Sequence, residues 1–135
     1  MIAPDTSVVI AALAPWHSAH ARSREALRGE QLGLVAHVAF ETTSALSRMP
    51  YGQRIAAPIV LEALERAFPT RWLALDGGDL QDALTRAVRA GIRGGALYDA
   101  LVGATTSAHD ALLLSADRRA IPAYEAADAH FTMLG

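Results

Sequence analysis

The stretch MIAPDTSVVIAALAP, residues 1–15, joins a short apolar segment to an apolar helical pattern through a polar turn. Residues 1–4 have the character of a short buried strand. The tripeptide DTS at 5–7 then supplies a carboxylate and two hydroxyls of the kind that cap a helix N-terminus, and Pro15 marks the place where the helix should end. A strand that turns directly into a helix begins a βαβ unit, so this stretch predicts an α/β fold.

The same alternation continues along the rest of the chain. Further strands are predicted at 32–36, 71–75, 112–114 and around Phe131, and helices at 18–28, 40–49, about 60–68, 79–88 and 96–108, with a short helix near Pro122. Alternating apolar strands and amphipathic helices are typical of an open, mostly parallel sheet with helices on both faces. We therefore expect a three-layer α/β/α fold with five strands, in a single domain spanning residues 1–135.

The composition narrows the class of protein. The chain of 135 residues is 52% apolar and 19% charged, which suits one compact domain with a real core. It has no cysteine, so disulfides and thiolate metal sites are excluded, and no apolar run approaches the ~18 residues of a membrane span. The apolar run at 8–14 also lacks the basic flank of an export signal. We expect a soluble cytoplasmic protein with no membrane partner.

The charges limit the chemistry and the partners. All 12 basic residues are arginine, which excludes chemistry that needs a lysine ammonium or Schiff base. The net charge of -2 gives no global attraction for a polyanion, so nucleic-acid binding would need a local arginine patch. Candidates for such contacts are Arg118 and Arg119, with Arg48 and Arg93 as further possibilities; solvated surface arginines are the simpler alternative.

Four of the 14 acidic residues fall where an α/β fold builds its ligand site, beyond the carboxyl ends of the strands. Asp5 directly follows the first strand, and Glu41 opens the helix after the second. Asp117 follows the strand 112–114 with two residues between. Asp99 lies in the first turn of the preceding helix, with Gly103 one turn on, where a missing side chain leaves room for a close neighbour. We expect these four acids to converge at one edge of the sheet.

Converging carboxylates would repel one another unless a divalent cation neutralised them. Oxygen ligands without cysteine favour a hard ion such as Mg²⁺ or Mn²⁺, which bridges readily to phosphate oxygens. Each acid also has a purely structural explanation: Asp5 as an N-cap, Glu41 and Asp99 as favourable charges at helix N-termini, and Asp117 as a turn former. The pattern alone leaves both interpretations open.

Four motifs resemble the PIN-domain family, specifically its VapC-type toxins: IAPDTS at 2–7, FETTSALSR at 40–48, GGALYDALVGATT at 94–106 and LLLSADRRA at 112–120. The similarity spans essentially the whole chain. It implies that Asp5, Glu41, Asp99 and Asp117 are the catalytic, metal-binding acids, with Thr6 or Ser7 and Ser115 as supporting hydroxyls.

The resemblance also implies a five-stranded parallel sheet and Mg²⁺- or Mn²⁺-dependent endoribonuclease activity on RNA. It further implies a homodimer and inhibition by a cognate VapB-type antitoxin. An aspartyl-phosphate phosphatase would share the Asp after the first strand, but the absence of lysine, and Ser7 where a second Asp would be wanted, argue against it. A catalytically inert, PIN-like dimerising or nucleic-acid-binding module is the remaining alternative, which the presence of all four acids disfavours.

Overall fold

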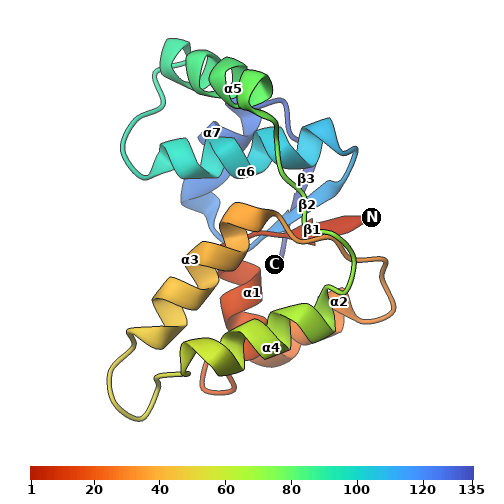
Figure 1. Ribbon diagram of the computed structural model, residues 1–135, viewed down its shortest axis with the longest axis vertical. Helices are drawn as coiled ribbons and strands as arrows, with labels where there is room; N and C mark the ends of the chain where they lie inside the picture. The colour runs from red at the N-terminus through yellow and green to blue at the C-terminus, as the bar shows by residue number, and fades with distance from the viewer.

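The computed structural model describes residues 1–135 as a parallel sheet between two groups of helices (Figure 1). The elements are β1 (Ile2–Pro4), α1 (Thr6–Leu13), α2 (His20–Leu27), α3 (Ala36–Ser47), α4 (Ala57–Ala67), α5 (Gly77–Arg89), α6 (Ala96–Ala108), β2 (Leu112–Ser115), the 3₁₀ turn η1 (Arg118–Ala120), α7 (Ile121–Ala126) and β3 (Phe131–Met133). Helices α1 to α4 lie on one side of the sheet and α5 to α7 on the other. The predicted α/β fold with helices on both faces is confirmed. No helix is both long and apolar enough to cross a membrane.

The sheet has three strands in the order β1-β2-β3, all parallel. Ile2 pairs with Leu112, and Leu113 pairs with Phe131. Parallel neighbours bring the carboxyl ends of β1 and β2 to the same edge of the sheet. The residues that follow these two strands therefore lie next to each other, which is the basis of the site described below.

The expected count of five strands is wrong. The segment predicted as a strand at 32–36 pairs with β1 through one isolated bridge, Ile2 to Leu32. The segment at 71–75 pairs only with 32–36, through the bridge from Val35 to Leu73. Helix α3 begins at Ala36, so the chain leaves the sheet before a longer ladder can form. An added Cβ at Gly33 would overlap the end of the Met1 side chain, which would have to move to make room for it.

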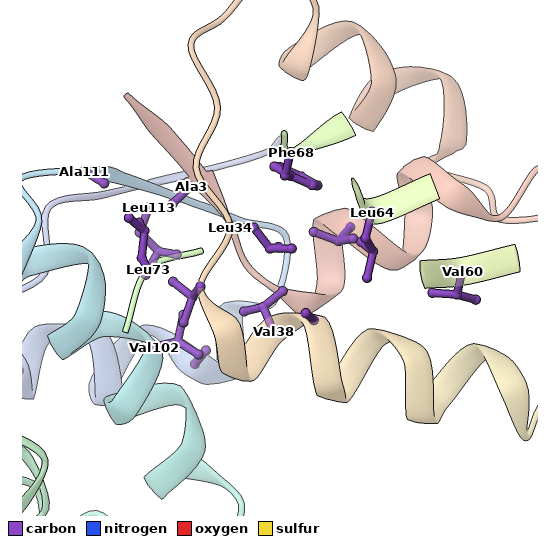
Figure 2. Close-up of a cluster of buried hydrophobic side chains, with 14 of the residues drawn as sticks. Ala3, Leu34, Val38, Val60, Leu64, Phe68, Leu73, Val102, Ala111 and Leu113 are labelled. Atoms are coloured by element: carbon purple, nitrogen blue, oxygen red, sulfur yellow. The ribbon is translucent and has the colours of Figure 1, made fainter. Parts of the chain in front are cut away.

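The hydrophobic core fills the space between the sheet, α1, α3 and α4 and continues towards α6. Figure 2 shows Ala3 and Leu113 from the sheet near Leu34 and Leu73, with Val38, Leu64 and Phe68 further along the same cluster. A second, smaller cluster consists of Ala87, Ala100 and Ala123, from α5, α6 and α7 respectively. Because alanine side chains are short, these three helices approach one another closely at that point.

Candidate active site

Asp5 lies at the junction of β1 and α1 and is 4% exposed. Its backbone N–H donates to the carbonyl of Leu114 at 2.8 Å, which ties it to β2. Its side chain is the N-cap of α1, since Oδ1 accepts from the N–H of Val8 at 3.2 Å and from the hydroxyl of Ser7. The capping role considered from the sequence is therefore real. It leaves the other carboxylate oxygen, Oδ2, for further contacts.

Glu41 lies in the second turn of α3 and contacts Thr6, the residue after Asp5. The sequence predicted that Glu41 would open this helix, but α3 begins at Ala36, five residues earlier. The hydroxyl of Thr6 donates to Glu41 Oε1 at 3.1 Å, and His37 Nε2 lies 3.3 Å from the same oxygen. The His37 ring stacks on Tyr98 with centroids 4.9 Å apart, so α3 and α6 are in contact at the edge of the site.

Asp99 lies in the first turn of α6, and its pKa is affected by the other three acids. Its pKa is raised from 3.8 to about 6, first by burial and then by the negative charges of Glu41, Asp117 and Asp5. The positive charge of Arg119 acts in the opposite direction. The three neighbouring carboxylates are therefore close enough to disfavour ionisation of Asp99. The negative charges of all three other predicted acids therefore act on Asp99.

Asp117 follows β2 and caps the turn η1. Its Oδ1 accepts from the backbone N–H of Arg119 at 3.0 Å and from the guanidinium Nε at 3.2 Å, and its own N–H donates to Ser115 Oγ at 3.1 Å. The Arg119 side chain is almost fully exposed, which places a cation at the rim of the acidic cluster. Arg118, Arg48 and Arg93 are exposed and make no ion pair with the four acids.

Two serine hydroxyls tie these acids to the backbone. Ser7 Oγ donates to Asp5 and accepts from the N–H of Ala116 at 3.0 Å, so it links the start of α1 to the loop before Asp117. Ser115 is fully buried, and its hydroxyl oxygen accepts a hydrogen bond from the N–H of Asp117. Both were expected as supporting hydroxyls. Thr6, the stated alternative to Ser7, contacts Glu41 instead of Asp5.

Tyr124, in α7, is a residue at this site that sequence reasoning missed. Its hydroxyl donates to Asp5 Oδ2 at 2.6 Å. Burial raises the pKa of the Tyr124 phenol far above its usual value, and the charge and hydrogen bond of Asp5 raise it further. The two residues are 119 positions apart, and no local pattern connects them. His37 was also missed, because its place beside Glu41 depends on the early start of α3.

The donor set is chemically suited to a hard divalent cation, because it consists of carboxylates and hydroxyls without sulfur. The mutual repulsion that raises the pKa of Asp99 is the kind that a cation would relieve. As the side chains stand, no three of the histidine, aspartate and glutamate residues form a group that could hold a metal ion. Mg²⁺ usually keeps several waters and binds through one or two carboxylates, so direct ligation by three groups is not required.

Comparison with known proteins decides the family. The family model for the PIN domain matches residues 2–126 of this chain. The chain belongs to the PIN-domain family. This PIN domain is 44% identical to Ribonuclease VapC40 of Mycobacterium tuberculosis over 126 residues, which cover 93% of this chain and 92% of the relative. It is 33% identical to Ribonuclease VapC27 of the same species, over 96% of this chain and 93% of that one.

Among solved structures, this PIN domain is similar to FitAcB from Neisseria gonorrhoeae, with a TM-score of 0.71 and 20% identity. The match covers 97% of this chain and 96% of the other. At this level of identity the likeness shows the fold alone. The resemblance to VapC-type PIN domains that the four motifs indicated is confirmed by the family model and by both mycobacterial relatives.

Proposed function

We propose that this PIN domain is a Mg²⁺- or Mn²⁺-dependent endoribonuclease that acts as the toxin of a type II toxin–antitoxin pair. One observation carries the proposal: Asp5, Glu41 and Asp117, from three separate segments, all raise the pKa of Asp99. Such convergence costs stability unless it serves a ligand. The relative that is 44% identical over most of the chain is itself named a ribonuclease.

In the proposed mechanism, Asp5, Glu41, Asp99 and Asp117 would hold the cation, either directly or through its bound waters, and would orient the attacking water. When bound, the ion supplies neutralising charge at the phosphodiester and lowers the pKa of water. Ser7 and Thr6 keep the carboxylates of Asp5 and Glu41 in place through their hydroxyls. In-line attack by water leaves a 5′-phosphate and a 3′-hydroxyl, whereas attack by the ribose 2′-hydroxyl would leave a cyclic phosphate.

The decisive experiment uses the purified chain, freed of any bound partner, with a mixed cellular RNA pool. The reaction is run with Mg²⁺, with Mn²⁺ and with excess chelator. Asp99→Asn is compared with Asp79→Asn, because Asp79 is also an acidic residue in the first turn of a helix but lies in α5 and is exposed. We expect cleavage that leaves 5′-phosphates, stops in chelator, is lost in Asp99→Asn and is retained in Asp79→Asn.

Cleavage that persists in chelator, or that leaves cyclic phosphates, would contradict the proposed mechanism. No cleavage of any RNA, with Asp99→Asn still binding metal and RNA like the parent, would favour the inert binding module instead.

The proposed partners are RNA, a VapB-type antitoxin and a second copy of this chain, and the proposed location is the cytoplasm. The positive rim residue Arg119, beside the acidic cluster, is a candidate contact for RNA phosphate. Size-exclusion chromatography with light scattering, with and without a co-expressed antitoxin, tests the assembly. A monomer that captures no antitoxin would contradict this part of the proposal.

A further inference from the structure

Tyr124 and Asp5 form a buried hydrogen bond between the two ends of the chain. Tyr124 is 1% exposed and Asp5 is 4% exposed. The phenol oxygen donates to Asp5 Oδ2 at 2.6 Å, a short distance typical of a hydroxyl bound to an ionised carboxylate. Asp5 comes from the β1–α1 junction and Tyr124 from α7, so the bond links the first strand to the last helix. Only the tertiary fold brings these residues together.

The hydrogen bonds of Asp5 define which part of its carboxylate is available. A carboxylate offers about four acceptor positions, two on each oxygen. Oδ1 accepts from Ser7 Oγ and from the N–H of Val8, which occupies both of its positions. Oδ2 accepts from Tyr124 alone. One position on Oδ2 therefore has no donor from the protein, and the Tyr124 hydroxyl occupies the other.

The ring of Tyr124 is held firmly enough to aim that hydroxyl. On one side lies Gly103 of α6, where an added Cβ would be 3.4 Å from Tyr124 Cδ1 and 3.2 Å from the Cβ of Ala127. The ring of Phe131 lies 5.7 Å away between centroids. A phenylalanine would fill this apolar space equally well. The hydroxyl is therefore the part of Tyr124 that packing does not explain.

We propose that Tyr124 is a positioning residue that orients the free acceptor of Asp5 Oδ2 towards the cation proposed for this site. The inference rests on the proposed function for the role of Asp5 as a metal ligand, but not on the identity of the RNA. Loss of a residue that hydrogen-bonds to a metal ligand commonly weakens metal binding by 10- to 100-fold. Tyr124 acts through Asp5 in the same way.

The first test measures Mn²⁺ affinity by calorimetry in Tyr124→Phe, with no RNA present. We expect binding about 10- to 100-fold weaker than in the parent. Tyr51→Phe, at a fully exposed tyrosine, is the matched control and should bind like the parent. Val60→Ala, at a buried position of α4 in the other group of helices, controls for lost stability and should also leave Mn²⁺ affinity unchanged. A folded Tyr124→Phe with parental affinity overturns the inference.

A second test keeps the parent sequence and therefore does not depend on how the variant folds. In protein labelled with ¹³C at the tyrosine ζ carbon, Mg²⁺ titration should shift the Tyr124 signal with the binding isotherm while the Tyr51 signal stays in place. A Tyr124 signal that stays fixed through saturation overturns the inference. If the parent binds no Mn²⁺ or Mg²⁺, the inference fails with the metal site. If the parent binds the metal but cuts no RNA, only the proposed function fails.

Discussion

At the level of single residues, Asp99 combines burial with three like-charged neighbours. Its raised pKa means that the folded, metal-free protein binds a proton at Asp99 more tightly than the unfolded chain does. The protonated form thus contributes stability that is complete below about pH 4, and this contribution is lost as the pH rises through about 6. Above that range the ionised Asp99 destabilises the fold.

The corresponding prediction concerns Asp99→Asn without metal. The variant should be more stable than the parent at pH 7 by roughly 1 kcal/mol, because solvent screening reduces the effect at a half-buried group. The difference should vanish near pH 4. Urea unfolding from pH 4 to 8 in chelator measures it. A difference that does not depend on pH would show that the four carboxylates do not interact as described.

Ser7 offers a second residue-level test, because its hydroxyl bonds both Asp5 and the N–H of Ala116. Ser7→Ala should lower the free energy of unfolding by about 1–2 kcal/mol, since both partners lose a hydrogen bond at a partly buried position. Ser47→Ala is the control: its hydroxyl bonds only the carbonyl of Ser44 in its own helix, and it should change stability by less than about 0.5 kcal/mol. Equal losses in both variants would contradict the linking role of Ser7.

At the level of elements, the sequence located most helices but not every helix start. Helix α3 begins at Ala36 after Val35, which provides no side-chain cap, so the sequence contains no signal for its first residue. Helix α5 is capped by Asp76, whose carboxylate accepts from the N–H of Asp79. The helix therefore begins at Gly77, two residues before the predicted start at Asp79. The early start of α3 places Glu41 in the second turn, where Thr6 can reach it.

The packing of α6 against α7 yields the prediction for Gly103. The sequence indicated that this glycine leaves room for a close neighbour. In the structure, Ala127, Ala129 and Tyr124 lie against Gly103, where a Cβ would crowd them. Gly103→Val should destabilise the protein by about 1–3 kcal/mol through overpacking. Gly95→Ala, where an added Cβ meets open space, should not destabilise it. Thermal unfolding of both variants measures the contrast, and a Gly103→Val as stable as the parent would contradict the close packing.

At the level of the whole molecule, the metal binding proposed for the acidic cluster would be coupled to folding. Four segments must assemble before the carboxylates meet, so the unfolded chain has no equivalent site. At 100 times its dissociation constant, an ion that binds only the folded state stabilises it by about 2.7 kcal/mol.

Saturating Mn²⁺ should therefore raise the Tm of the parent by roughly 10 °C, given the size of the domain. Differential scanning fluorimetry across a Mn²⁺ titration measures this shift. The rise should be much smaller in Asp5→Asn and unchanged in Asp79→Asn. An equal rise in Asp5→Asn would place the bound ion elsewhere on the protein.

The sequence by itself indicated the fold class, most of the helices and, together with the motifs that resemble the PIN-domain family, the four acids proposed for the site. These depend on local signals: hydrophobic periodicity, capping residues, and the rule that ligand sites form beyond the carboxyl ends of parallel strands. Tertiary structure alone decided the number of strands in the sheet. Whether the segments around Leu32 and Leu73 form strands or single bridges depends on the backbone hydrogen-bond partners that the adjacent segment provides. Tertiary structure also decided that Tyr124 donates to Asp5. A hydrogen bond between residues so far apart in sequence is set by helix packing, and packing leaves no local pattern in the sequence.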